Sequence, residues 1–386
     1  MRALFVEKKE CCGCSACLNI CPKQAIQMKE DFKGYLYPQI DKSLCVGCNL
    51  CEKVCPLKHE VKKNNFTARA FGMKNKDANE RRKSSSGSVF IEAAKYILDQ
   101  GGIVYGVRMS SRFQVEFGRA TSLKEAREFQ GSKYVQSIKA DNYKMVKKDL
   151  EKGKFVLFTG TPCEIGGLKK YLGKEYDKLY TLDIICHGVP SQKLLQKCIA
   201  EREEKNHAKI KEMTFRDKTY GWRHQEINMT FENNKNYHAP IWEDEFYRLF
   251  TSNYILRESC YSCCYANMER VGDMTIGDFW NIKNVYEAFE DNLGVSSLLI
   301  NSEKGKDLFD RIRENFESFE CSLDDIEQTN LKRPSLKPED YESFQRDYQK
   351  KGMSYCLRRY GKMGKVEMIK RFLSPMKKKL MDIVKK

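Results

Sequence analysis

The sequence predicts a small α+β domain, then a larger α/β domain with a mixed, largely parallel sheet, and finally a helical C-terminal tail. Three observations predict this class. A run of closely spaced cysteines occurs twice within residues 11–56. From residue 88 to residue 186, short apolar segments of strand length alternate with segments of helical periodicity. Near the end of the chain, apolar residues recur at helical steps between lysines.

The composition indicates a folded protein of a reducing compartment. Of the 386 residues, 41% are hydrophobic and 32% are charged. We find no apolar run of membrane-spanning length and no secretory signal pattern, so we expect a cytoplasmic protein. In such a compartment, the close spacing among the 17 cysteines favours metal or redox chemistry over disulfides.

The two cysteine runs have the same spacing, Cys-x2-Cys-x2-Cys-x3-Cys-Pro, and lie 34 residues apart. This is the run of bacterial two-cluster ferredoxins, in which the fourth cysteine ligates the other cluster. The first run therefore predicts a 4Fe–4S cluster held by three of its own cysteines and the last cysteine of the second run, and the second run predicts the reciprocal set. The predicted ligands are Cys11, Cys14, Cys17 and Cys55 for cluster one, and Cys45, Cys48, Cys51 and Cys21 for cluster two.

Zinc is the main alternative for the two runs, but it prefers four ligands in two separated pairs. Gly13 and Gly47 provide the backbone freedom that a loop needs to wrap a cluster. Cys12 falls outside the spacing, and we interpret it as a buried thiol. Residues 1–57 are thus predicted to form a two-cluster ferredoxin domain, followed by a polar linker over 58–67.

The α/β pattern begins with a helix in "SVFIEAAKYILDQGG" (88–102), which ends on two glycines. Strands are predicted in "IVYGV" (103–107), "KFVLFTG" (154–160) and "LYTLDIIC" (179–186), with a helix in "EIGGLKKYLG" (164–173). The later segments "EMTFRD", "EINMTFE" and "DMTIGDFW" are predicted to be further strands, as an antiparallel extension of the sheet.

Four more cysteines stand in contexts that suit a third cluster. Cys163 and Cys186 follow predicted strands, where ligands gather at the carboxyl edge of an open α/β sheet. Cys260 and Cys263 form a Cys-x2-Cys pair, and Cys264 is an alternative to Cys263. For each cysteine taken singly, the other interpretation is a small buried apolar side chain, which we prefer for Cys198, Cys321 and Cys356.

The sequence resembles the coenzyme F420 hydrogenase/dehydrogenase beta-subunit family, in its bacterial branch with a ferredoxin domain in front. The resemblance lies in "SSSGSVF", "GSKYVQS", "LFTGTPCEIGGLKKYLG", "DIICHGVPS", "FRDKTYGW", "CYSCCYA" and "TIGDFW". It covers residues 68–335 and leaves 336–386 as a basic helical tail. The resemblance implies an iron–sulfur flavoprotein of anaerobic bacteria that binds FAD beside a third 4Fe–4S cluster held by Cys163, Cys186, Cys260 and Cys263.

The flavin contacts are predicted in three loops. The first precedes a helix whose N-terminus suits the FAD pyrophosphate, with a serine-rich helix cap as the alternative. The second offers a lysine for phosphate charge and ring contacts, or is a solvated loop. The third is a strand-to-helix turn. The predicted residues are Ser85, Ser86, Gly87 and Ser88, then Ser132, Lys133, Tyr134 and Gln136, and finally Thr159, Gly160 and Thr161.

His187 is the predicted catalytic residue, as a proton donor to a substrate that accepts two electrons. The alternative is a histidine that hydrogen-bonds nearby backbone. Arg216, Asp217 and Lys218 are predicted to hold an anionic substrate or, alternatively, to form surface ion pairs. Asp278 is predicted to orient a group beside the flavin or the cluster.

The net charge of +16 is concentrated at the end of the chain, where residues 351–386 carry +10. A basic surface favours an acidic partner or an anionic membrane. A helix that packs on the domain is the alternative for the tail. Nucleic acid is not expected, because no nucleic-acid-binding motif accompanies the charge.

These observations predict an iron–sulfur oxidoreductase that takes electrons from an external ferredoxin or another acidic redox protein. The electrons pass through 4Fe–4S clusters to FAD and on to a small acceptor, which the resemblance implies to be a sugar or polysaccharide intermediate. Two alternatives remain. One is a non-catalytic subunit that wires a partner enzyme. The other is an oxidoreductase of coenzyme F420 itself.

Overall fold

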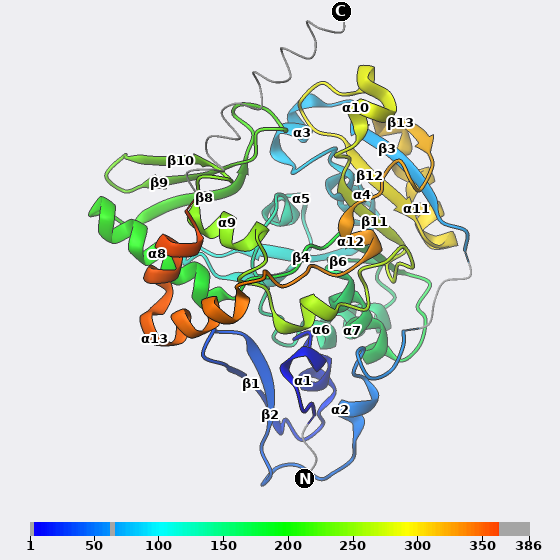
Figure 1. The fold of residues 1–386 in the computed structure, drawn as a ribbon. Helices are drawn as coiled ribbons and strands as arrows, with labels where there is room; N and C mark the ends of the chain where they lie inside the picture. The colour runs from blue at the N-terminus through cyan, green and yellow to red at the C-terminus, as the bar shows by residue number, and fades with distance from the viewer. Residues whose placement is uncertain (1–3, 62–65, 363–386) are drawn as a thin grey trace, which may run out of the picture.

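The computed structural model describes residues 4–61 and 66–362. The first cysteine run opens a small α+β unit, coloured blue in Figure 1, in which β1 (Ile26–Glu30) pairs antiparallel with β2 (Leu36–Ile40). Each cysteine run also contains a short helix, α1 (Ala16–Ile20) and α2 (Leu50–Lys53). Both helices begin after a residue with positive φ, Ser15 and Asn49, so the two runs repeat one local geometry. This ferredoxin-like fold was predicted.

An eight-stranded mixed sheet forms the centre of the larger domain, in the order β13-β3-β12-β11-β7-β6-β4-β5. The four strands β11, β7, β6 and β4 run parallel, and antiparallel strands extend the sheet at both ends. The strands are β3 (Arg69–Asn75), β4 (Ile103–Met109), β5 (Val115–Ala120), β6 (Val156–Gly160), β7 (Leu179–Ile184), β11 (Met274–Asp278), β12 (Ser296–Ile300) and β13 (Phe316–Cys321).

Helices cover both faces of this sheet, so its central strands are buried on both sides. Leu157 of β6 packs in the core beneath α4 and α11, whereas its neighbours Val156 and Phe158 pack in the core beneath α6 and α7. The described helices after the second cysteine run are α3 (Ala78–Lys83), α4 (Val89–Asp99), α5 (Leu123–Ala126), α6 (Asn142–Glu151), α7 (Pro162–Leu172), α8 (Gln192–Asn206), α9 (Glu245–Thr251), α10 (Ile282–Tyr286), α11 (Glu303–Ile312), α12 (Thr329–Lys332) and α13 (Tyr341–Tyr360). The described residues also form five short 3₁₀ helices, η1 (Lys8–Glu10), η2 (Arg127–Phe129), η3 (Glu258–Ser262), η4 (Glu287–Phe289) and η5 (Arg313–Asn315).

Three later strands form a separate antiparallel sheet, β10-β9-β8, rather than an extension of the main one. These are β8 (Ile210–Asp217), β9 (Glu226–Phe231) and β10 (Asn236–Pro240). Their inner face packs on α8, α9 and α13 in a core of its own. The prediction of an antiparallel extension was therefore wrong for the segments at 212–217 and 226–232. It was also wrong for the segment at 273–280, because β11 pairs parallel with β7 in the middle of the main sheet.

The ferredoxin-like unit is not an independent globule, because it shares its core with the α/β domain. Ala16 of α1 is fully buried and belongs to the same apolar cluster as Ile165 and Leu168 of α7. On the other side, the Tyr35 hydroxyl donates to the Ile255 carbonyl at 2.8 Å. Figure 1 shows the unit seated below α6 and α7. Its clusters would therefore lie against the larger domain.

The C-terminal tail is helical as far as it is described, since α13 runs to Tyr360 with a break at Gly352. The predicted amphipathic segment over 366–384 lies outside the described residues. None of the described helices is both long and apolar enough to cross a membrane. The domain boundaries at 57, 67 and 335 stay predictions.

Candidate functional site

The second cysteine run and the end of the first run line one cavity, which we call the cluster-two site. Its sulfur-bearing residues are Cys21, Cys45, Cys48 and Cys51. This is the set that the ferredoxin pattern predicts, with Cys21 contributed by the other run. Cys48 is exposed, and the surrounding side chains Val46 and Leu50 are 63% and 36% exposed. The cluster-two site therefore opens to the surface.

The cluster-one site is the cavity lined by the first run and the last cysteine of the second. Its predicted ligands Cys11, Cys14, Cys17 and Cys55 all lie on this cavity, together with Cys12 and Cys51. Cys14 is buried, and the other three predicted ligands are partly buried. The predicted ligands of cluster one are thus more buried than those of cluster two, although every residue that lines the cluster-one cavity belongs to the ferredoxin-like unit.

A third cysteine site lies where the carboxyl ends of β6 and β7 meet η3. Cys163, Cys186, Cys260 and Cys263 line its cavity, and so does Cys12. Cys264 is exposed and is not among the lining residues, which favours Cys263 over Cys264 as a ligand. The structure therefore brings together the four cysteines that the resemblance assigned to a third cluster.

Local sequence explains how Cys163 reaches this site. Thr161 caps α7 in a capping box with Glu164, and Pro162 occupies the first turn. Cys163 follows in the same turn, and the Thr161 hydroxyl lies 3.2 Å from its sulfur. A hydrogen bond with Cys12 and burial raise the pKa of the Cys163 thiol well above its usual range, so this thiol ionises when a metal binds it.

The loop that carries Cys263 is anchored to β7 by a buried ion pair. Arg270 Nη2 lies 2.9 Å from Asp183 Oδ1, and both side chains are at most 1% exposed. The same guanidinium donates to the carbonyls of Tyr265 and Ile184. Because Ile184 ends β7 just before Cys186, Arg270 holds the two cysteine-bearing segments together.

A second buried ion pair supports the turn before α7. Lys139 Nζ lies 2.8 Å from Glu164 Oε1, and the residues are 2% and 5% exposed. Glu164 also accepts hydrogen bonds from the Thr161 amide and the Ser137 hydroxyl. Lys139 lowers the pKa of Glu164 against the opposing effect of burial. The carboxylate thus stays ionised and fixes the position of Cys163.

The spacing and environment of these cysteines fit iron–sulfur clusters better than zinc. Around one tetrahedral zinc ion, ligand sulfurs lie roughly 3.8 Å apart, given Zn–S bonds of about 2.3 Å. Among the described residues, only one group of three or more candidate ligands has all its ligand atoms within 4.8 Å of one another, and it contains no cysteine. Cubane clusters place irons between their thiolates and need the wider spacing.

Burial also makes the thiols of the third site poor free nucleophiles. Desolvation raises the pKa of Cys186 well above its usual range and that of Cys260 to about 12. A coordinating metal offsets this cost, because it deprotonates the thiol that binds it. The residues of all three sites therefore suit metal ligation.

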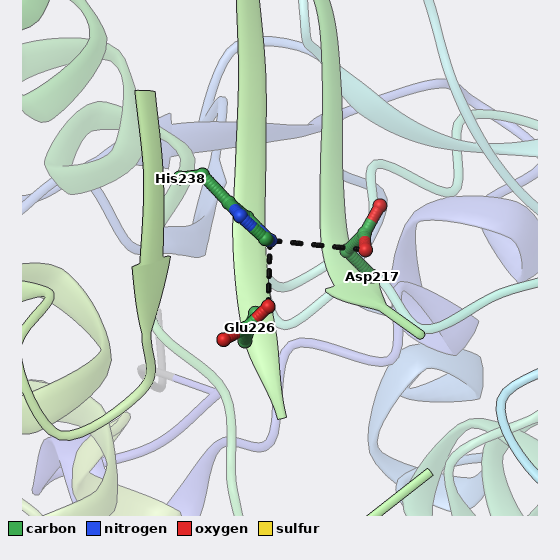
Figure 2. A group of neighbouring side chains, drawn as sticks. All are labelled: Asp217, Glu226 and His238. Carbon is green, nitrogen blue, oxygen red and sulfur yellow. Dashed lines mark ion pairs between the residues drawn. The ribbon is translucent and has the colours of Figure 1, made fainter. Parts of the chain in front are cut away.

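The group without cysteine consists of Asp217, Glu226 and His238 on the three-stranded sheet (Figure 2). His238 Nε2 lies 2.6 Å from Glu226 Oε2 and 3.8 Å from Asp217 Oδ1. The 2.6 Å separation is shorter than two ligands of one metal ion adopt and is typical of an ion pair. Asp217 was predicted to contact an anionic substrate or, alternatively, to form a surface ion pair. In this structure it has the second of these roles.

The other predicted substrate contacts are also engaged within the protein. Arg216 Nη1 lies 2.5 Å from Asp278 Oδ2, and Trp222 donates to the other oxygen of the same carboxylate. Lys218 Nζ donates to the carbonyls of Arg81 and Leu293. Desolvation lowers the pKa of Lys218 to about 7. Asp278 thus orients Arg216 and Trp222, and a role beside the flavin or the cluster stays a prediction.

The first predicted flavin loop is packed into the sheet. A Cβ on Gly87 would lie 2.1 Å from the Met73 carbonyl, so this glycine is explained by strand packing. Ser86 pairs with Ser296, whereas the Ser88 hydroxyl is buried without a partner. The unpartnered Ser88 hydroxyl is still able to contact a ligand. At Gly87, however, the close packing leaves no open backbone of the kind that a pyrophosphate requires.

The second loop meets the first, since the Ser85 and Ser132 hydroxyls are 2.8 Å apart. Lys133 Nζ donates to the carbonyls of Glu128 and Gln130, and desolvation lowers its pKa to about 7. Tyr134 packs its ring on Phe215 and Phe250.

Gln136 and the third predicted flavin loop lie next to the cysteine sites. Gln136 donates to the Cys12 carbonyl. Thr159 donates to the Tyr105 carbonyl, and a Cβ on Gly160 would lie 2.8 Å from Glu164 Oε2. Thr161 lines the third site.

His187, the predicted proton donor, lines the third site next to Cys186. Its Nε2 lies 3.3 Å from the Phe250 carbonyl, and its ring packs edge-on against the Phe250 ring. Burial lowers the pKa of His187. The contact with backbone is the alternative that the sequence left open, and the catalytic role stays a prediction.

Two family models match parts of the regions that the resemblance indicated. Residues 153–325 match the model for the C terminus of the coenzyme F420 hydrogenase/dehydrogenase beta subunit, and residues 10–58 match the 4Fe-4S dicluster domain. The chain thus joins a region related to this beta subunit to a dicluster domain, and iron–sulfur electron transfer follows as its general class.

One solved structure is similar to the larger part of the chain. It is a chain of the F420-reducing NiFe hydrogenase complex from Methanosarcina barkeri, with a TM-score of 0.45 and 16% sequence identity. The match covers 67% of this chain and 83% of that chain. No curated protein matches the chain.

Three residues with evident roles were missed from the sequence. Cys12 is buried, as predicted, but its place between the cluster-one site and the third site was not predicted. Arg257 and Arg270 carried no motif, although each stands within seven residues of Cys263. The one feature of the sequence that could have indicated these two arginines is their closeness to a Cys-x2-Cys pair.

Lys139→Met should destabilise the protein by about 3–5 kcal/mol, because it leaves the buried Glu164 carboxylate without its cation. The thermal unfolding midpoint of the anaerobic protein should fall accordingly. Lys139→Met combined with Glu164→Gln removes both charges and should recover most of the loss. Equal midpoints for the single variant and the native chain would contradict the role of this pair.

Cys263→Ser should reduce the iron content by roughly four atoms per chain, the content of one cubane cluster. The matched control, Cys264→Ser, should retain the full content, because Cys264 does not line the third site. Iron and sulfide analysis of anaerobically purified protein measures both. Loss of iron from the Cys264 variant alone would reverse the assignment.

Proposed function

We propose that the chain is an iron–sulfur oxidoreductase subunit that passes electrons from a docked redox protein to an acceptor in the α/β domain. One observation carries the proposal, namely that the three cysteine sites are contiguous. Cys51 lines both the cluster-two and the cluster-one site, and Cys12 lines both the cluster-one and the third site. Single-electron transfer is the chemistry that 4Fe–4S clusters supply when they are bound at such sites.

The exposed cluster-two site supports entry of electrons at the tip of the ferredoxin-like unit. Leu44, Val46 and Leu50 are 50%, 63% and 36% exposed around it. A small exposed apolar patch suits the weak, short-lived contacts of redox proteins. The exposed Lys23 on the cluster-two site favours an acidic donor of the ferredoxin type.

FAD is proposed as the two-electron group, on the ground of the family resemblance. The buried and unpartnered Ser88 hydroxyl at the start of α4 supports a ligand there. The filled space at Gly87 speaks against a pyrophosphate at that residue. A sugar or polysaccharide intermediate is the proposed acceptor, and coenzyme F420 is the alternative substrate.

The second candidate function is a wiring subunit that binds no flavin and delivers electrons to a partner enzyme. The closed packing at Gly87 and the engaged ammonium of Lys133 favour it. Both functions share the path along the three cysteine sites. They differ in what receives the electrons.

Anaerobically purified protein should contain three 4Fe–4S clusters and one FAD, counted by iron, sulfide and flavin analysis. In stopped-flow measurements, reduced ferredoxin should bleach the cluster absorbance first and the flavin absorbance afterwards. Clusters that are reduced in a chain without flavin would favour the wiring function. Absence of iron and sulfide would contradict both candidates.

Val46→Asp should slow reduction by an acidic ferredoxin about tenfold, because it places a like charge on the docking patch. Reduction by dithionite, which needs no docked protein, should be unchanged. Tyr220→Asp is the control, since Tyr220 is 61% exposed and follows β8, away from the patch. The proposed entry point is wrong if both variants react with ferredoxin at the native rate.

A further inference from the structure

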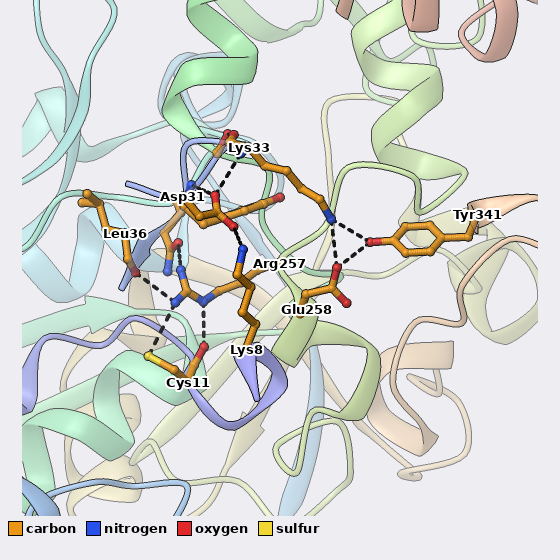
Figure 3. Close-up of polar contacts among 11 residues, drawn as sticks. Lys8, Cys11, Asp31, Lys33, Leu36, Arg257, Glu258 and Tyr341 are labelled. Atoms are coloured by element: carbon orange, nitrogen blue, oxygen red, sulfur yellow. Dashed lines mark hydrogen bonds and ion pairs between the residues drawn. The ribbon is translucent and has the colours of Figure 1, made fainter. Parts of the chain in front are cut away.

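Arg257 is a buried cation that lies against the cluster-one site without a carboxylate partner. Its side chain is 1% exposed and is among the largest that are fully buried. Nε donates to the Cys11 carbonyl at 2.8 Å, Nη1 to Gln136 Oε1 at 2.8 Å and Nη2 to the Leu36 carbonyl at 3.0 Å. Nη2 also lies 3.5 Å from the Cys11 sulfur (Figure 3).

The acids nearest to Arg257 are paired with lysines. Glu258 lies 2.9 Å from Lys33 and 3.1 Å from Lys337, and Asp31 lies 2.5 Å from Lys8. Figure 3 shows the Lys33–Glu258 and Lys8–Asp31 pairs beside the guanidinium, which faces Cys11 instead. In the described part of the chain, Arg257 forms no ion pair with a carboxylate. Its other neighbours are the ring of Tyr37, 4.1 Å away, and that of Tyr35.

Such a charge is costly to bury unless an anion compensates it. The other buried arginine near these sites, Arg270, has Asp183 as its partner. For Arg257 the available anion is the sulfur of Cys11, a predicted ligand of cluster one. The cation therefore has a partner when Cys11 is a thiolate bound to a cluster, and a stronger one when that cluster gains an electron.

The duplicated loops differ at this contact. Gly13 has φ +71°, and a Cβ there would lie 2.7 Å from Gln136 Nε2 and 2.9 Å from Arg257 Cζ. The equivalent Gly47 has φ +69°, but no described atom lies within 4 Å of the place its Cβ would take. The guanidinium thus approaches the first loop where only glycine leaves room, and the second loop faces open space.

We propose that Arg257 raises the reduction potential of the cluster-one site above that of the cluster-two site and so directs electrons inward from the surface. The proposal rests on the proposed function. Reduction adds one negative charge to a cluster, and a cation held close in a medium of low dielectric stabilises that charge. Hydrogen bonds to cluster sulfurs act in the same direction.

Arg257 also links the cluster-one site to the third site. The backbone amide of Arg257 donates to the Val189 carbonyl, and the backbone carbonyl of Arg257 accepts a hydrogen bond from the Cys260 amide. Gln136, which accepts from Nη1, donates to the Cys12 carbonyl through its amide nitrogen. The side chain that contacts cluster one is therefore held by segments that carry Cys260 and Cys12.

Arg257→Gln in the anaerobic holoprotein tests the proposal through potentials rather than activity. Redox titrations followed by electron paramagnetic resonance should show cluster one becoming at least tenfold harder to reduce, a fall of about 59 mV for a one-electron couple. Cluster two, whose loop faces open space at Gly47, serves as the internal reference and should keep its potential. Arg257→Lys keeps the charge but loses the forked donors, so its shift should be smaller and of the same sign.

Lys23→Gln is the matched control, because it removes one positive charge at an exposed residue on the cluster-two site. Any shift in this control should vanish at high salt, whereas the shift from Arg257 should persist. An unchanged cluster-one potential in the Arg257→Gln variant with full iron content would overturn the proposal, as would an equal shift of all clusters. Failure of the proposed function itself would be read from the native protein, as absent cluster signals or no reduction by ferredoxin.

Discussion

The contact between the first cysteine run and α7 organises the whole molecule. At Gly167 of α7, a Cβ would lie 2.8 Å from Cys14 Cβ and 2.9 Å from its sulfur. At Gly166, a Cβ would lie 2.4 Å from the Tyr265 hydroxyl. Two glycines in a helix cost stability, which the close packing offsets. They let the cluster-one loop and the Cys263 loop approach the helix that begins with Cys163.

In the proposed function, this contact places cysteines from distant parts of the sequence along one electron path. Cys12 lies between the cluster-one site and the third site because the first run is pressed on α7. Efficient transfer requires neighbouring centres to be close and fixed. The shared apolar core of α1, α6 and α7 supplies that rigidity, since a well-packed interior resists displacement.

Buried charges divide into two kinds around the sites. The Lys139–Glu164 and Arg270–Asp183 pairs are neutral overall and fix the segments that carry Cys163, Cys186 and Cys263. Arg257 keeps a net charge and lies against Cys11. Paired charges position backbone, whereas an unpaired one changes the electrostatic potential at its neighbour. The same residue types therefore serve stability in two places and redox tuning in the third.

The dicluster unit could be predicted from the sequence alone, because Cys-x2-Cys-x2-Cys-x3-Cys-Pro imposes a local loop that the structure repeats at Ser15 and Asn49. The parallel centre of the main sheet could be predicted too, since strand and helix periodicities alternate along the chain. The sheet to which each later strand belongs depends on long-range pairing, which the local sequence does not specify. As a result, β8 and β9 pair in a separate sheet, whereas β11 lies in the middle of the main sheet. Long-range packing likewise determined that Gly13 faces a guanidinium while Gly47 does not. The two cysteine runs have equivalent local structures, but their environments differ because Gly13 of the first run packs on the α/β domain and Gly47 of the second does not.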